Sequence, residues 1–110
     1  MSRAEGRPFG VTVTEQAEGV LVQVAGEVDL VTAPVLQRHL DSALDGRRPM
    51  VVIDLAETTF LDARGVAVLV RARKRVVQDG GRLVIRRPPP LVRRVLELAD
   101  QLDRVDVEDD

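Results

Sequence analysis

Hydrophobic and polar residues alternate in two segments near the start of the chain, 11–14 and 20–25. In both segments valine occupies every second position for part of the run, and a period of two is typical of a strand that buries one face. The pair Glu18-Gly19 between the segments favours a turn. The pattern therefore predicts a β-hairpin whose strands are joined by residues 15–19.

From residue 32 onward the apolar positions follow helical spacing instead. Thr32 is a suitable N-cap, Pro34 is tolerated in a first turn, and Gly46 is a residue type at which helices commonly end. The apolar residues that recur at intervals of three and four here are Leu36, Leu40, Ala43 and Leu44. A first helix is therefore expected between Thr32 and Gly46.

The same spacing predicts two further helices. One runs from about Asp62 to about Gln78 and ends at Gly80-Gly81, and the other begins at the prolines 88–90. The expected buried face of the earlier helix consists of Val66, Leu69, Val70, Val76 and Val77. The expected inward residues of the later helix are Leu91, Val95, Leu98, Ala99 and Leu102.

Two unbroken apolar runs, 50–53 and 83–85, have the length of strands and suit central strands covered on both faces. Val105 and Val107 predict a last strand at the edge of the sheet. Strands that alternate with helices indicate βαβ units. We therefore expect one α/β domain over residues 9–110, with a mixed sheet, helices packed on it and the order β-β-α-β-α-β-α-β, after a flexible tail of residues 1–8.

Composition narrows the classes of function. Apolar residues make up 45% of the chain and Phe9 and Phe60 are its only aromatics, so the core is expected to be aliphatic and base or sugar stacking is disfavoured. With 16 basic and 18 acidic residues, the net charge of −2 gives no overall attraction to nucleic acid. The chain lacks cysteine, a signal region and an apolar stretch long enough to cross a bilayer. We expect a cytoplasmic protein that does not insert into membranes.

Residues with catalytic or metal-binding chemistry are scattered. Asp54 and Asp62 could suggest an acid–base pair or a magnesium site, but nothing in the sequence indicates the pocket and shifted pKa values that catalysis needs. His39 has no second histidine or cysteine as a co-ligand. The basic run 71–75 could contact nucleic acid or an acidic protein, and the scarcity of aromatics counts against nucleic acid. The sequence therefore predicts no enzyme activity, no metal and no cofactor.

Three motifs in the same order carry a resemblance to a known family. The central one is a buried strand, a polar loop over residues 56–59, and then Phe60-Leu61-Asp62-Ala63-Arg64-Gly65-Val66. The others are Gly26-Glu27-Val28-Asp29 followed by Thr32-Ala33-Pro34, and Gly80-Gly81 followed by the late segment 93–98. Over roughly residues 10–107 the chain resembles the STAS domain of anti-sigma factor antagonists. In that family an aspartate, two small residues that are often serines, and a glycine stand at the start of a helix.

The central motif also has a physical interpretation of its own. As N-cap, Asp62 would accept hydrogen bonds from the N–H groups of residues 64 and 65, and Gly65 would let another backbone approach closely. The resemblance makes Arg64 the equivalent of the serine that a partner kinase phosphorylates in the family, and arginine has no hydroxyl. Thr58 and Thr59 are possible substitute phosphoacceptors. The expected partner-binding residues are Asp29, Thr32, Asp62, Ala63, Arg64 and Gly65.

The resemblance implies a function through protein binding. An antagonist of this family binds an anti-sigma factor of the serine-kinase type and so releases its sigma factor, and here the usual phosphorylation switch is expected to be missing. Arg64 is then either a contact for an acidic patch on the partner or the result of drift after the switch was lost. The alternative function is that of a stand-alone STAS accessory subunit of a membrane lipid ABC transporter. The sequence does not indicate the oligomeric state.

Overall fold

The computed structural model describes residues 8–98 and 106–108. Within these residues the strands and helices follow the order β-β-α-β-α-β-α-β, as the sequence predicts. The elements are β1 (Gly10–Gln16), β2 (Gly19–Val28), α1 (Ala33–Ala43), β3 (Met50–Leu61), α2 (Ala63–Gln78), β4 (Arg82–Arg86), α3 (Pro90–Leu98) and β5 (Asp106–Glu108). The predicted tail lies almost wholly in residues 1–7, outside the described part.

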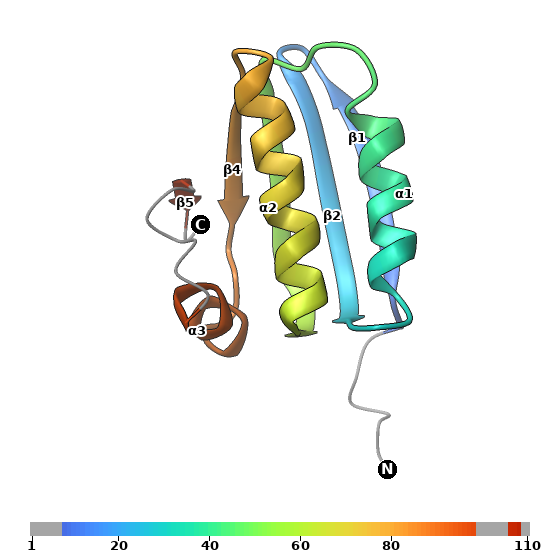
Figure 1. The fold of residues 1–110 in the computed structure, drawn as a ribbon, viewed down its shortest axis with the longest axis vertical. Helices are drawn as coiled ribbons and strands as arrows, with labels where there is room; N and C mark the ends of the chain where they lie inside the picture. The colour runs from blue at the N-terminus through green and yellow to red at the C-terminus, as the bar shows by residue number, and fades with distance from the viewer. Residues whose placement is uncertain (1–7, 99–105, 109–110) are drawn as a thin grey trace.

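The strands form one mixed sheet in the order β1-β2-β3-β4-β5. β1 pairs antiparallel with β2 in the predicted hairpin, while β2, β3, β4 and β5 are parallel to one another. The hairpin turn is shorter than expected, because residues 15, 16 and 19 already belong to the strands. α1 and α2 lie side by side on one face of this sheet (Figure 1). The predicted fold class is therefore confirmed.

The core is aliphatic and lies between the sheet and the helices. Val20, Val22 and Val24 alternate along β2 and are buried in it, which explains their period of two. In β3, Ile53 belongs to this core, whereas Val52 points by alternation to the other face and is buried there as well. A strand buried on both faces has no polar positions, and this accounts for the unbroken apolar run 50–53.

The prediction of a loop at residues 56–59 is wrong, because β3 continues through them to Leu61. The pairing of β2 with β3 shifts register twice here, between Gln23 and Ala25 and again between Gly26 and Glu27. Extra residues in one strand of a pair interrupt regular alternation, so this polar segment gives no period of two. The strand delivers Asp62 directly to the start of α2.

The predicted buried faces of two helices need correction. In α2, Val77 is 46% exposed, while Val68 and Ala72 are buried beside Val66, Leu69 and Val76. In α3, Leu91 and Leu98 are exposed and the buried residues are Val92 and Leu96, whereas Val95 is half-buried against the core as predicted. Each helix carries two adjacent apolar stripes, and packing selects one of them. Ala99, Leu102 and Val105 lie outside the described residues.

Candidate functional site

Two strand-to-helix junctions meet at one end of the sheet. The ends of β2 and β3 and the first turns of α1 and α2 lie together at the bottom of Figure 1. The backbone N–H of Asp62 donates to the carbonyl of Val28 at 3.1 Å, which ties the two junctions to each other. Parallel neighbouring strands place their carboxyl ends on the same edge, so residues about 33 positions apart share one surface.

The β3–α2 junction has the cap that the sequence predicts. Asp62 has extended backbone angles, and its Oδ1 accepts hydrogen bonds from the N–H of Arg64 at 2.9 Å and of Gly65 at 3.2 Å. Two of the N–H groups that a helix start leaves without a helical partner are satisfied in this way. The helix therefore begins at a fixed point, and Ala63 and Arg64 stand exposed in its first turn.

The guanidinium of Arg64 is not paired with any residue in the part of the chain that the structure describes. Within residues 8–98 and 106–108 no ion pair or hydrogen bond of this side chain is formed, and neither Asp29 nor Asp62 pairs with it. A cation in the first turn of a helix is disfavoured by about 0.3–1 kcal/mol, because the N-terminus carries a partial positive charge. Arg64 therefore contributes nothing evident to the stability of the fold.

Gly65 has a different role from the one that the sequence suggests. The residue is buried, and a Cβ built on it would lie 2.3 Å from Cδ1 of Leu61 and 2.9 Å from Cγ1 of Val28. The space beside this glycine is thus occupied by side chains of the protein's own core. Glycine is required because β2 and β3 pack directly against the first turn of α2.

The β2–α1 junction is closed by its own hydrogen bonds. Oδ1 of Asp29 accepts from the N–H of Val31 at 3.0 Å and of Thr32 at 3.1 Å. The Thr32 hydroxyl accepts from the N–H of Asp29 at 2.9 Å and donates to the Glu27 carbonyl at 2.7 Å. The Thr32 N–H is the main reason that the pKa of Asp29 lies below its ordinary value of 3.8, and the N–H of Val31 and the Thr32 hydroxyl add to the effect.

Thr32 is the residue before α1, as predicted, but its side chain does not cap the helix. Its hydroxyl is engaged by Asp29 and Glu27 instead. The N–H of Ala33 donates to the carbonyl of Asp29 at 2.8 Å, so the loop itself satisfies the start of the helix. Asp29 and Thr32 hold the shape of this junction.

Sequence reasoning missed two exposed apolar residues in the same loop. Leu30 is 60% exposed and Val31 is 75% exposed. They fit neither the period of β2 nor that of α1, and two adjacent apolar residues outside both periods are a signal that could have identified them. We call Leu30, Val31, Ala63 and Arg64 the junction surface.

The comparisons with known proteins match this architecture. A family model described as Mlab, STAS domain covers residues 11–105. The chain belongs to the STAS domain family. That resemblance, predicted from three motifs, is confirmed.

Relatives of this STAS domain include anti-sigma factor antagonists. The anti-sigma F factor antagonist of Paenibacillus polymyxa is 30% identical over 87 residues, which cover 77% of this chain and 74% of the relative. The anti-sigma-B factor antagonist of Bacillus subtilis (strain 168) is 26% identical over 99 residues, 90% of each chain. A crystal structure of an anti-sigma factor antagonist from Mycobacterium paratuberculosis matches with a TM-score of 0.81 at 26% identity, covering 92% of this chain and 86% of that one.

The two threonines before the junction of this STAS domain differ in accessibility. Thr58 is 1% exposed, and its hydroxyl donates to the Val24 carbonyl at 2.8 Å. A kinase could reach that hydroxyl only if β3 separated from β2. Thr59 is exposed, so of the two substitute phosphoacceptors it is the accessible one.

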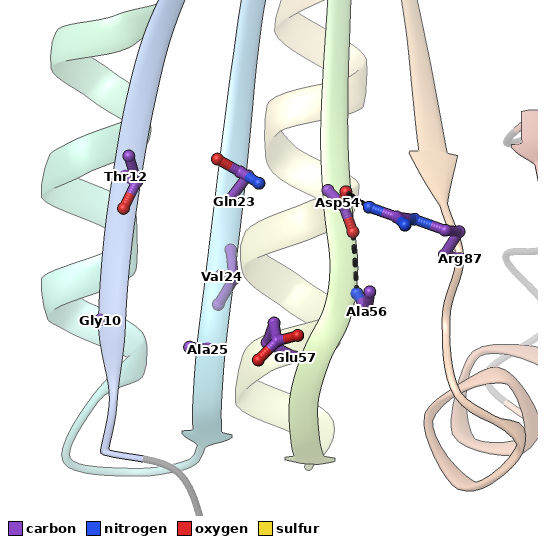
Figure 2. Close-up of a pocket in the computed structure, with 9 residues that line it drawn as sticks. All are labelled: Gly10, Thr12, Gln23, Val24, Ala25, Asp54, Ala56, Glu57 and Arg87. Atoms are coloured by element: carbon purple, nitrogen blue, oxygen red, sulfur yellow. Dashed lines mark hydrogen bonds and ion pairs between the residues drawn. The ribbon is translucent and has the colours of Figure 1, made fainter. Parts of the chain in front are cut away.

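Asp54 lies in a pocket on the face of the sheet away from α1 and α2 (Figure 2). The pocket, of about 280 Å³, is lined by Thr12, Gln23, Glu57 and Arg87 among others. Oδ1 of Asp54 accepts from the N–H of Ala56 at 2.9 Å, and Oδ2 pairs with the guanidinium of Arg87. Both oxygens are thus occupied, and the pair joins β3 to the segment after β4.

Two further kinds of feature are absent from the described residues of the STAS domain. In the described part of the chain, no three His, Cys, Asp or Glu side chains group closely enough to hold a metal ion. No helix there combines the length and apolarity needed to span a membrane. The described surface offers a pair of fixed junctions with exposed apolar and cationic side chains.

Proposed function

We propose that this protein is an anti-sigma factor antagonist that binds an anti-sigma factor of the serine-kinase type, so that the sigma factor held by that partner is released. Two relatives that cover most of this chain carry the name of antagonist, and one of them is matched over 90% of both chains. The protein then acts by occupying a surface of its partner, in the cytoplasm where sigma factors work. No catalytic group is required.

The exposed junction surface is the observation that supports binding best. Leu30 and Val31 present apolar side chains to water, and Arg64 presents a charge without a partner in the described chain. Exposed apolar side chains gain free energy when a partner removes water from them, and arginine is enriched among the residues that anchor protein interfaces. Asp29, Thr32 and Asp62 hold the backbone on which these side chains stand.

We infer that the binding is constitutive with respect to phosphorylation at this surface. A phosphate would bring about −1.5 to −2 charges to the start of α2, where a partner has to cover it. Arg64 has no hydroxyl to accept a phosphate, and Thr58 is buried. The junction surface then keeps its positive charge whether or not ATP is present.

The experiment measures the affinity of the purified protein for serine-kinase-type anti-sigma factors from the same genome, with and without ATP, by calorimetry. Intact-mass analysis after each incubation reports phosphorylation. We expect one partner to bind equally well in both conditions and the mass of the antagonist to stay unchanged. ATP-dependent release with phosphate mapped to Thr59 contradicts constitutive binding, and failure of every such partner to bind contradicts the function.

Arg64→Ser supplies the matched control, since it places a hydroxyl at the position where the family has its phosphoacceptor. Without ATP this variant is expected to bind the partner more weakly than the unaltered protein, because the guanidinium is gone, and with ATP it is expected to gain a phosphate and lose most of the remaining affinity. Arg64→Glu tests the charge alone and is expected to weaken binding in both conditions. If neither variant differs from the unaltered protein, Arg64 is not a contact residue.

The missing hydroxyl also favours a second candidate function. A stand-alone STAS subunit of a membrane lipid ABC transporter needs no phosphorylation switch, and the matching family model is described as Mlab, STAS domain. The two functions predict different partners. Identification by mass spectrometry of the protein that co-purifies with the tagged chain separates them, with a kinase-like anti-sigma factor supporting the first and a transporter ATPase subunit the second.

A further inference from the structure

A groove of about 220 Å³ runs between α1 and α2, beside the junction surface. Ala33 and Pro34 line it from α1, and Ala67 lines it from α2, so small side chains leave the space open. Sites for drug-sized ligands measure about 300–1,000 Å³ and are mostly enclosed. This groove is smaller and shallower, and its size suits a single side chain of another protein.

Two arginines of α2 line the groove, Arg64 and Arg71. They are seven residues apart, which places them on the same face of the helix with about 10 Å between their Cα atoms along the axis. In the chain as described, neither guanidinium forms an ion pair with a carboxylate. Arg75, one turn further on, is instead 3.7 Å from a carboxylate oxygen of Asp41. Among the described residues, the end of the groove near the junction surface thus holds two arginines that are not directly paired with a carboxylate.

The side chain of Arg71 is held in position by α1. Its Nη1 donates to Oε1 of Gln37 at 2.8 Å, and Nε2 of Gln37 donates to Oδ1 of Asp41 at 2.8 Å. The second bond fixes which way the Gln37 amide points, so that its oxygen faces Arg71. A guanidinium that is oriented before binding loses less side-chain entropy when it meets an anion.

We propose that this groove receives a carboxylate side chain, an aspartate or glutamate of the partner protein, between Arg64 and Arg71. Guanidinium groups pair with carboxylates through short, charge-assisted hydrogen bonds, and one carboxylate relieves the repulsion between two cations. The chemistry of the groove is independent of the partner's identity. Only the statement that the carboxylate belongs to an anti-sigma factor rests on the proposed function.

The first test uses a hexaglutamate peptide as the probe and records backbone amide chemical shifts of the intact protein by NMR at low salt. Shifts are expected to concentrate at groove residues such as Gln37, Ala67 and Arg71. Arg71→Gln is expected to lower the affinity for the peptide roughly tenfold, because it removes one of the two positive charges of the groove. Lys74→Gln removes the same charge from an exposed position of α2 outside the groove and is expected to change the affinity less than twofold.

Equal losses in the Arg71→Gln and Lys74→Gln variants would show diffuse attraction by the whole basic run and overturn the carboxylate site. So would shifts that spread over all basic residues. A third arm replaces the peptide with vesicles of phosphatidylglycerol. If the unaltered protein binds the vesicles, the Arg71→Gln variant does not, and hexaglutamate causes no chemical-shift changes, the groove is a site for anionic lipid and the proposal is overturned as well.

The second test repeats the variants with the anti-sigma factor that binds the unaltered protein in calorimetry. Arg71→Gln is expected to lower the affinity of that complex roughly tenfold and Lys74→Gln less than twofold. The loss in Arg71→Gln should be smaller at high salt, because salt screens the interaction between the charges. The two tests fail separately. If hexaglutamate binds as expected but no anti-sigma factor does, the proposed function fails and the groove stands; if the partner binds and Arg71→Gln has no effect in either test, the groove fails and the function stands.

Discussion

The two junctions at the carboxyl edge of the sheet use the same capping chemistry. At each of them an aspartate comes directly after the strand, and one oxygen of its carboxylate accepts from the N–H groups two and three residues later. Asp29 does this after β2 and Asp62 after β3. In both cases a short polar side chain satisfies backbone donors that would otherwise lack partners.

The segments after the two aspartates differ. After Asp62 the helix begins at the next residue. Gly65, in the first turn of this helix, is buried against Leu61. After Asp29 three residues precede the helix, and two of them expose apolar side chains. The same capping arrangement can therefore precede a helix that packs directly on the core, or a loop whose apolar side chains are exposed to a partner. The β3–α2 junction is held by core packing in addition to its hydrogen bonds, whereas the β2–α1 junction is held mainly by hydrogen bonds.

Gly65→Val should have the largest effect on this comparison. Its Cβ would already lie 2.3 Å from a methyl carbon of Leu61 and 2.9 Å from one of Val28, both of which are buried. Added bulk in a packed core costs roughly 1–3 kcal/mol, and the better helix propensity of valine relative to glycine offsets only a few tenths of a kcal/mol of this loss. Urea unfolding followed by circular dichroism measures the change.

Ala63→Val is the matched control, because it places the same side chain two residues earlier at an exposed position of the same turn. We expect it to change the free energy of unfolding by about 0.5 kcal/mol or less. Equal losses in the two variants would mean that the added side chain costs no more at the buried position 65 than at the exposed position 63, so packing against Leu61 and Val28 would not be what requires glycine.

Removal of the caps should have a smaller effect. Asp62→Ala leaves the N–H groups of Arg64 and Gly65 without their acceptor, and loss of an N-cap costs about 0.5–2 kcal/mol. Asp45→Ala is the control, since Asp45 is exposed and its side chain forms no hydrogen bond or ion pair with any described residue. The free energy of unfolding, measured in urea, should fall clearly only for Asp62→Ala.

Asp29→Ala removes the corresponding cap at the β2–α1 junction and so tests how the two junctions differ. It should also lower stability, but its main consequence is expected in the loop, because Asp29 holds the N–H groups of Val31 and Thr32. Amide hydrogen exchange of residues 30–32 should quicken in this variant and stay unchanged in Asp62→Ala. If Asp62→Ala quickens exchange in both junctions equally, the two caps act as one unit through the bond from Asp62 to Val28.

The parts of the fold that could be predicted from sequence are those set by local periodicity. The period of two along β2 and the N-cap at Asp62 both depend on residues close in the chain, and the structure confirms them. The choice between Leu91 and Val92 as buried residues of α3 could not be predicted, because both stripes are apolar and only the sheet decides between them.

The site shows the same division. The exposed position of Arg64 is set by the cap two residues before it, and the motif around Asp62 identifies the family. Contacts between distant residues have no local signal: Asp54 meets Arg87, and Gln37 meets Arg71, across 33 and 34 positions. The groove between α1 and α2 exists only once the sheet has brought those helices together.

The smallest expected effect concerns the protonation of Asp29. The N–H of Thr32, with smaller contributions from the N–H of Val31 and the Thr32 hydroxyl, lowers the pKa of this carboxyl below 3.8 in the folded protein. The folded state then binds fewer protons than the unfolded state as the pH falls through this range. The stabilisation is therefore fully present above about pH 5, well above the ordinary value of 3.8, and is lost as the pH falls through the lower pKa of the folded state.

Carboxyl-carbon NMR titration of Asp29 measures this directly, and its midpoint is expected below 3.8. Thr32→Val removes the hydroxyl but keeps the backbone N–H, so the midpoint should move up only part of the way. In unfolding experiments, the stability difference between the unaltered protein and Asp29→Asn should be constant above about pH 5 and shrink in stronger acid. A titration midpoint at or above 3.8 would mean that the hydrogen bonds from residues 31 and 32 to Asp29 do not hold the loop in solution. The two junctions would then differ in that the β3–α2 junction is ordered by packing and the β2–α1 loop is mobile.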